Sequence, residues 1–211
     1  MKIAIDGPAG AGKSTVATAL ARRLGFVHLD SGALYRALAV MALRQAVDPA
    51  SERDLVHLLG TVQLTPLPDG VAVDGLELDQ ELRTPAVDAV VSKVAQHPAV
   101  RAAMVQIQRQ WGQGRDVVAD GRDIGTVVWP DAEVKIFLTA SLAARADRRA
   151  TEQGGLERLQ VEQEIARRDE KDSDRPVGPL RVAPHAVVVD TTALTVEEVV
   201  DRLVNIVRPL A

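Results

Sequence analysis

A glycine-rich segment near the amino terminus has the residue types and spacing that bind phosphate. It reads Gly7-Pro8-Ala9-Gly10-Ala11-Gly12-Lys13-Ser14-Thr15 and matches the G-x-x-x-x-G-K-[ST] pattern of a P-loop. Its glycines allow backbone angles that point N–H groups at an anion, and a helix starting near Lys13 adds the positive end of its dipole. The Lys13 ammonium can reach the β- and γ-phosphates, and the Ser14 hydroxyl can join the shell of a Mg²⁺ ion. The segment therefore predicts a site for a nucleoside triphosphate.

The P-loop leaves the reaction open among three classes: a small-molecule kinase, a GTPase switch and an ATP-driven motor or assembly subunit. A GTPase would need an Asn-Lys-x-Asp guanine reader, but the only asparagine is Asn205, which Ile-Val-Arg follows. A motor usually has a hydrophobic strand that ends in adjacent acidic residues. The best candidate, Val117–Gly121, contains Asp120 but lacks the second acid. A small kinase is therefore the favoured class.

Three further segments could bind an anionic acceptor, for which a kinase needs several arginines. They are Leu29–Arg36, with the sequence LDSGALYR; Ala119–Thr126, with ADGRDIGT; and Arg167–Arg175, with RRDEKDSDR. The first two follow expected strands, at the sheet edge where ligands bind in open α/β folds. Each also has a purely structural interpretation: Ser31 can cap a helix, Asp120–Asp123 can form a simple turn, and the mixed charges of the third segment suit a salt-bridged surface helix.

Short β-branched runs alternate with stretches of helical period, which predicts a parallel sheet with crossover helices. The expected strands are Lys2–Asp6, Phe26–Leu29, Val117–Asp120, Lys135–Thr139 and Ala186–Asp190. The expected helices include one from Ser31 to about Gln45 and one at Leu142–Gln153, with helix caps at Ser31, Thr84 and Thr195 and a C-terminal Gly25 after the first helix. The predicted fold class is α/β, a P-loop NTPase-type five-stranded parallel sheet wrapped by helices.

Between Thr61 and Thr84 the pattern changes to period-2 alternation, interrupted by Asp69-Gly70 and Asp74-Gly75. Asp-Gly pairs form tight hairpin turns, so this segment predicts a small antiparallel β insertion. We expect a single domain over residues 1–211, with its core at 1–60, 85–153 and 177–211. The insertion would occupy about 61–84, and a helical, charged lid would occupy about 154–176.

The composition narrows the class of protein further. The formal net charge of −4 argues against a general nucleic-acid binder, which would need a basic face. The chain has no cysteine, which excludes disulfides and thiolate metal sites. No export signal or apolar run of membrane-spanning length is evident. We therefore expect a cytoplasmic protein, a monomer, with small-molecule partners and with neither a nucleic-acid polymer nor a membrane.

Taken together, these segments resemble the cytidylate kinase family, the (d)CMP kinases among the P-loop nucleoside monophosphate kinases. The matching blocks are Ile5–Pro8 with the P-loop, Leu29–Arg36, Asp120–Val128, Val134–Leu138 and the spacing of Arg168, Asp172 and Arg175. The resemblance spans nearly the whole chain, and it implies that the antiparallel insertion at about 61–84 is the monophosphate-binding insert of this family. It implies phosphorylation of CMP and dCMP to CDP and dCDP in pyrimidine nucleotide metabolism, with ATP as phosphoryl donor and Mg²⁺. The alternatives are a kinase for another small acceptor, such as another nucleoside monophosphate or shikimate, and a non-catalytic nucleotide-binding switch.

The resemblance also implies a role for individual residues. Arg36, Arg122 and Arg175 would bind the CMP phosphate beside Ser31; Ser92, Arg101 and Asp123 would read the cytosine; Arg168 and Asp172 would contact the pentose; and Arg145 and Arg149 would be lid arginines over the triphosphate. Lys13, Arg122 and Arg175 would stabilise the transferring phosphoryl group. A carboxylate and an arginine complement the amino donor and the N3 and O2 acceptors of cytosine. Lys171 stands where the family commonly has arginine, so the charge is kept but the bidentate fork is lost.

Overall fold

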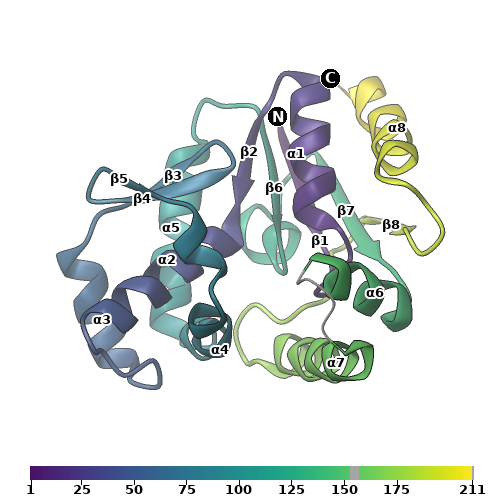
Figure 1. Ribbon diagram of the computed structural model, residues 1–211. Helices are drawn as coiled ribbons and strands as arrows, with labels where there is room; N and C mark the ends of the chain where they lie inside the picture. Colours follow the sequence, from purple (N-terminus) through teal and green to yellow (C-terminus); the bar gives the residue numbers. More distant parts are fainter. Residues whose placement is uncertain (153–156, 211) are drawn as a thin grey trace. The chain divides into compact units, whose positions relative to one another are not determined.

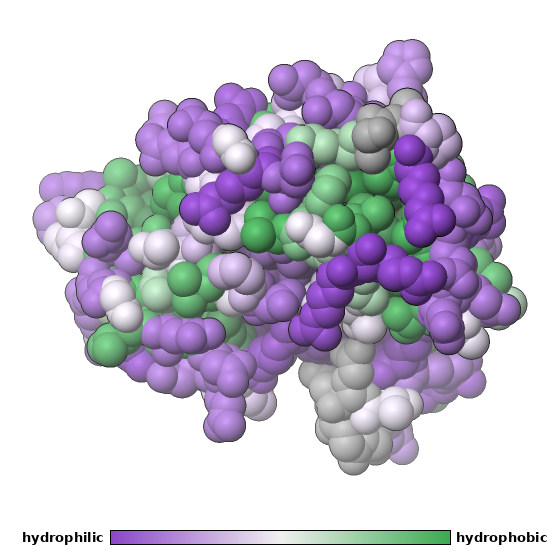
Figure 2. Space-filling view, turned by 90° about the horizontal axis from the view of Figure 1, so that it is seen from above, coloured by the Kyte–Doolittle hydropathy of each residue, from purple (hydrophilic) through white to green (hydrophobic). Residues whose placement is uncertain are grey.

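A computed structural model describes residues 1–152 and 157–210, and its elements are labelled in Figure 1. The chain forms two compact units. Unit 1 comprises Met1–Val27 and the chain from Arg115 onward, and unit 2 comprises His28–Gly114. No helix among the described residues is long and apolar enough to cross a membrane. The face in Figure 2 is mostly hydrophilic, with apolar residues in patches between the polar ones.

The main sheet has five strands in the order β2-β6-β1-β7-β8. They are β1 (Lys2–Asp6), β2 (Val27–Asp30), β6 (Val117–Gly121), β7 (Val134–Thr139) and β8 (Val187–Asp190). All five predicted strands are confirmed, with each end within one residue of its predicted position. The parallel register pairs Ile5 of the central β1 with Asp120 of β6 and Ile136 of β7. The carboxyl ends of these strands therefore meet at one edge of the sheet, where the P-loop begins.

Four helices complete the regular framework of unit 1 within the described residues: α1 (Lys13–Leu24), α6 (Leu142–Glu152), α7 (Arg158–Asp174) and α8 (Val196–Val207). Short helical turns lie at η2 (Ile124–Val128) and η3 (Arg208–Leu210). Helix α1 ends at Gly25, which adopts the expected left-handed conformation with φ 71°. The predicted capping box at Thr195 opens α8, which packs alongside α1 (Figure 1). Gln153 and the first residues of the predicted lid, 154–156, lie outside the described residues.

Unit 2 contains the helices α2 (Ser31–Arg44), α3 (Glu52–Thr61), α4 (Pro85–Val94) and α5 (Pro98–Gly112), together with the turn η1 (Gln80–Arg83). Its antiparallel sheet has the order β3-β4-β5, formed by β3 (Leu64–Leu67), β4 (Gly70–Val73) and β5 (Leu76–Leu78). The predicted β insertion is thus confirmed. Its hairpin turns hold Asp69 and Asp74 at positive φ, as Asp-Gly turns require. An aliphatic core joins the helices to this sheet, with Leu38, Leu55 and Val71 fully buried.

The start of α2 differs from the prediction that Ser31 is its cap. Asp30 is the N-cap, and its carboxylate accepts the N–H of Ala33 at 3.1 Å. The physical reason is that β2 extends through Asp30, so Asp30 is the last residue with extended angles and Ser31 is already helical. The cap predicted for α4 is confirmed, because Thr84 accepts the N–H of Val87.

Candidate active site

The P-loop joins β1 to α1, and two of its glycines have backbone conformations that the site needs. Gly7 has φ 154°, and a Cβ atom there would lie 2.1 Å from the carbonyl oxygen of Leu138 in β7. Only glycine lets the loop pass so close to the neighbouring strand. Gly12, at φ 83°, precedes α1 and has no side chain to occupy the first N–H groups of that helix. These N–H groups can therefore bind an anion.

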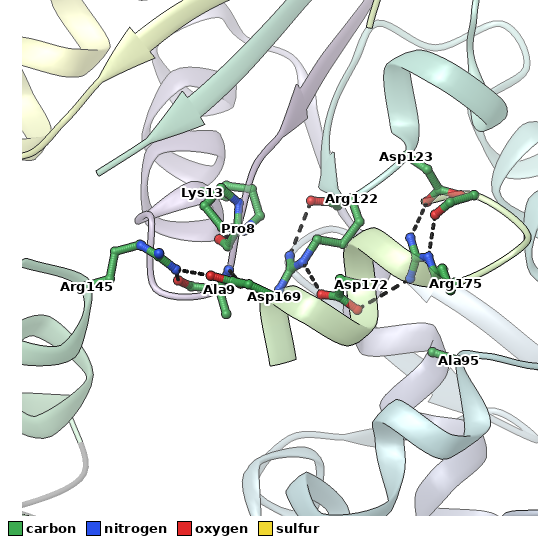
Figure 3. Close-up of polar contacts among 12 residues, drawn as sticks. Pro8, Ala9, Lys13, Ala95, Arg122, Asp123, Arg145, Asp169, Asp172 and Arg175 are labelled. Atoms are coloured by element: carbon green, nitrogen blue, oxygen red, sulfur yellow. Dashed lines mark hydrogen bonds and ion pairs between the residues drawn. The ribbon is translucent and has the colours of Figure 1, made fainter. Parts of the chain in front are cut away.

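Lys13 curls back onto the loop that carries it (Figure 3). Its side chain is 6% exposed, and its ammonium donates to the carbonyl of Pro8 at 2.7 Å. Burial, with a further contribution from the nearby charges of Arg122 and Arg168, lowers the pKa of Lys13 to about 7. A bound anion would favour the charged form of this lysine, because opposite charges raise the pKa of an ammonium.

Ser14 has a carboxylate partner that sequence reasoning did not identify. Its hydroxyl donates to Asp120 Oδ2 at 2.7 Å, and Asp120 is buried at the carboxyl end of β6. The sequence signal was an acidic residue at the end of a strand that the parallel topology places beside β1. Hydroxyl and carboxylate oxygens suit Mg²⁺, which keeps several waters and binds substrate phosphates. No cluster of three or more His, Asp or Glu residues that could hold a metal was found within 1–152 and 157–210.

Four predicted acceptor residues form a continuous chain of ion pairs in unit 1 (Figure 3). Arg122 Nε donates to Asp172 Oδ2 at 2.8 Å, Asp172 Oδ1 lies 3.6 Å from Arg175 Nη1, and Arg175 Nη2 lies 3.7 Å from Asp123 Oδ1. Burial acts to raise the pKa of Asp172, but Arg122, Arg168 and Arg175 outweigh it and hold that pKa below its usual value. Arg122 and Asp172 are 50 residues apart in the sequence. The loop after β6 and the end of α7 thus form one charged cluster.

Arg145 contacts the backbone of the P-loop. Its Nη1 donates to the carbonyl of Ala9 at 2.9 Å and pairs with Asp169, and its Nε donates to the carbonyl of Ala140 at 3.1 Å. Asp169 in turn accepts the N–H of Ala9 at 2.9 Å (Figure 3). Helices α6 and α7 therefore both hold the backbone of the P-loop in place. The sequence interpretation did not identify Asp169, because its partner lies 160 residues away.

Helix α6 carries two further arginines, Arg148 and Arg149. Arg149 was predicted to contact the triphosphate and is half-buried on α6. Arg148, which was not predicted, donates to the hydroxyl of Thr191 at 3.1 Å. Its Nη1 would also lie 3.9 Å from a Cβ atom built on Gly12. Arg148 thus lies next to the P-loop, so one helical turn provides more than one cation near the phosphate site.

Unit 2 carries four further predicted residues: Ser31 and Arg36 on α2, Ser92 on α4 and Arg101 on α5. The predicted Arg168 lies on α7 in unit 1. Arg36 is held by two partners, because its Nη2 donates to Asp88 at 2.7 Å and its Nη1 to the carbonyl of Leu82 at 2.8 Å. Ser31 is buried and Ser92 half-buried. These two contacts hold the Arg36 guanidinium, which extends from a largely apolar helix.

Arg101 is the most deeply buried of these cations, at 2% exposure. Its Nη1 donates to the carbonyl of Ala95 at 2.9 Å, and its guanidinium lies 5.4 Å from the ring centroid of Tyr35. An arginine buried to this extent is costly unless its charge is balanced by such contacts. Its burial distinguishes Arg101 from an ordinary solvated helix residue. Lys171, on α7 of unit 1, is exposed.

A P-loop at the carboxyl edge of a five-stranded parallel sheet, with the half-buried Arg122 and Arg168 near its lysine and Arg145 against its backbone, defines a P-loop kinase. A shikimate kinase from Bacteroides thetaiotaomicron has a similar fold, with 15% identity, 99% of this chain and 98% of that chain covered, and a TM-score of 0.50. The chain belongs to the cytidylate kinase family, whose model matches residues 3–209. Two cytidylate kinases are each 52% identical: that of Geobacillus kaustophilus, with 98% of this chain and 96% of the relative covered, and that of Geobacillus thermodenitrificans, with 97% and 95% covered.

Proposed function

We propose that this protein transfers the γ-phosphoryl group of ATP to CMP and dCMP, forming ADP and CDP or dCDP. The observation that carries the proposal is the arrangement within unit 1. A lysine-bearing P-loop and the ion-pair chain of Arg122, Asp172, Arg175 and Asp123 occur together in a chain of the cytidylate kinase family. The first can bind a phosphoryl donor, and the second has the arginines that an anionic acceptor requires.

On the donor side, the N–H groups of the P-loop and the Lys13 ammonium bind the triphosphate, with Arg145 and Arg149 near it. Ser14 would be a protein ligand for Mg²⁺, which would neutralise charge on the phosphates. Asp120 accepts a hydrogen bond from the Ser14 hydroxyl. Such an outer partner fixes the orientation of a metal ligand.

On the acceptor side, Arg122 and Arg175 bind the phosphate of CMP, and the family resemblance assigns Ser31 and Arg36 to the same phosphate. In the free protein Arg175 pairs with the Asp123 carboxylate. A substrate phosphate would replace this carboxylate, since arginine binds both groups in the same bidentate geometry. Asp123 would then be available to the base. No general base is needed, because the attacking phosphate oxygen already carries charge.

The base and sugar contacts follow from the same assignment. Ser92, Arg101 and Asp123 read the cytosine, and Arg168 and Asp172 contact the pentose. The Asp123 carboxylate accepts the N4 amino protons of cytosine, whereas uracil would present a carbonyl oxygen to it. Leaving two acceptors face to face in a buried site is how such sites discriminate strongly.

A coupled ADP-release assay across CMP, dCMP, UMP, AMP, GMP and shikimate tests the proposed reaction. Fastest turnover on CMP or dCMP is expected, and fastest turnover on another acceptor would refute the base assignment. ADP release that no acceptor stimulates would favour a nucleotide-binding switch. Asp123→Asn should narrow the gap in kcat/KM between CMP and UMP, because an amide can donate to uracil O4; an unchanged ratio would remove Asp123 from base recognition.

We further infer that the chain works in the cytoplasm as a monomer and as one functional domain. In this assignment residues 61–84 act as the monophosphate-binding insertion and 154–176 as the lid. Light scattering coupled to gel filtration would measure the oligomeric state, for which a mass near 22.6 kDa is expected. A mass of twice that value would contradict the monomer.

A further inference from the structure

Asp6 is a buried carboxylate that has no role in the proposed mechanism. It is the last residue of β1, directly before Gly7 of the P-loop, and it is 2% exposed. Its Oδ1 accepts the N–H of Ile124 and its Oδ2 the N–H of Gly125, both at 2.8 Å. These N–H groups are the first two of η2, so a residue on a different strand caps this turn. A buried carboxylate is tolerable only with such donors.

The turn that Asp6 caps comes directly after Arg122 and Asp123. Its π-helical turn is closed by the N–H of Val127 and Val128, which both bond to the carbonyl of Asp123. Turns of this type occur frequently at functional sites. Because the turn is short and internally bonded, its position determines where the two preceding residues lie.

The fit between Asp6 and this turn is close. A Cβ atom added to Gly125 would lie 3.3 Å from Asp6 Oδ2 and 3.2 Å from the Cβ of Ala183. Glycine at position 125 therefore leaves the space that this close approach needs, and a side chain there would crowd the contact. The two hydrogen bonds from Asp6 hold the turn that directly follows Arg122 and Asp123.

We propose that Asp6 is a positioning residue, whose carboxylate fixes the loop bearing Arg122 and Asp123 against the strand bearing the P-loop. It would thereby set the place of the acceptor nucleotide relative to the donor phosphates. This role rests on the proposed function, since it requires Arg122 and Asp123 to bind the acceptor. Phosphoryl transfer depends mainly on such positioning, and a misplacement of about 1 Å can cost about 100-fold in rate.

The surroundings of Asp6 make the contact sensitive to acid. Burial raises the pKa of Asp6 to about 6; the charge of Asp123 acts in the same direction, and the two N–H donors and the charge of Lys13 oppose it. Lys135 of β7 also passes Gly125, but its ammonium donates to a backbone carbonyl. A protonated carboxyl has an O–H group facing one of the two N–H donors, so one hydrogen bond is lost. Lowering the pH through about 6 should therefore loosen the turn.

Asp6→Asn tests the role with little change in shape, because its amide can accept from only one of the two N–H groups. We expect kcat/KM for CMP to fall about 10- to 100-fold, by analogy with other positioning losses. The CMP preference over UMP should narrow and the KM for ATP should change little. Glu198→Gln is the matched control, since it removes a carboxylate that caps α8 in the same unit. It should leave the CMP preference and both KM values as in the wild type.

Two measurements keep the test decisive if Asp6→Asn folds poorly. In the wild-type protein, the NMR shifts of the Ile124 and Gly125 amides should follow one titration centred near pH 6, while the Glu198 amide should not. Gly125→Ala keeps the carboxylate but crowds the contact, so it too should lower kcat/KM for CMP and narrow the CMP preference over UMP. Wild-type preference for CMP in both variants, or amide shifts that do not titrate, would overturn the positioning role alone. A wild-type protein without CMP kinase activity would overturn the proposed function as well.

Discussion

Nucleotide binding to the P-loop should take up a proton in mildly alkaline solution, because Lys13 is poised to titrate. Burial, assisted by Arg122 and Arg168, places its pKa at about 7 in the free protein. At about pH 8 a group with this pKa is neutral in about 0.9 of the molecules, and at about pH 6 in only about 0.1. A bound triphosphate favours the ammonium, so it should raise that pKa again. The expected uptake is therefore about 0.9 proton at the higher pH and about 0.1 at the lower.

Calorimetric titration with a non-hydrolysable ATP analogue, repeated in buffers of different ionisation enthalpy, measures this uptake. The phosphates of the nucleotide contribute little at the higher pH, since their last pKa is about 6 to 7. Lys13→Ala should abolish the uptake, and Lys93→Ala, which removes an exposed lysine of α4, should preserve it. Equal uptake at both pH values, or uptake that survives in Lys13→Ala, would refute the reasoning.

The same pKa fixes the sign of a stability effect. In the unfolded chain the lysine returns to its ordinary pKa of 10.5, so between about 7 and 10.5 the unfolded state binds the proton and the folded state does not. The contribution of Lys13 to the free energy of unfolding should therefore become more stabilising as the pH rises through this window. Urea unfolding across the window should show this rise in the wild type and a smaller rise in Lys13→Ala.

Three further substitutions test single contacts. Asp120→Ala removes the acceptor of the Ser14 hydroxyl, so it should weaken Mg²⁺ activation about 10- to 100-fold, measured as the Mg²⁺ dependence of kcat; unchanged dependence would contradict the orienting role. Asp169→Ala removes the acceptor of the Ala9 N–H and of the Arg145 guanidinium, so it should raise the KM for ATP and lower the melting temperature. A normal KM for ATP would show that the P-loop keeps its shape without Asp169. Thr195→Ala should cost about 1 kcal/mol, which lowers the melting temperature by about 2–4 °C while kinetics stay normal; altered kinetics would contradict a purely structural cap.

The sequence by itself determined the parts of this protein that depend on neighbouring residues. The P-loop, the capping box at Thr195, the left-handed Gly25 and the Asp-Gly turns of the insertion are all set by local backbone chemistry, and all were predicted. Strand ends were accurate to one residue, because the parallel strands are short apolar runs with clear boundaries. The cap at the start of α2 was assigned one residue late, since aspartate and serine are both good caps and only the length of β2 decides between them.

The tertiary structure alone decided which distant side chains meet. The partners Ser14 and Asp120 are 106 residues apart, Ala9 and Asp169 are 160 apart, and Asp6 lies 119 residues from Gly125. No periodicity connects such positions; the parallel order of the strands and the packing of α6 and α7 bring them together. Burial likewise gives Lys13 and Asp6 their shifted pKa values, because desolvation depends on everything that surrounds a group and not on its own segment.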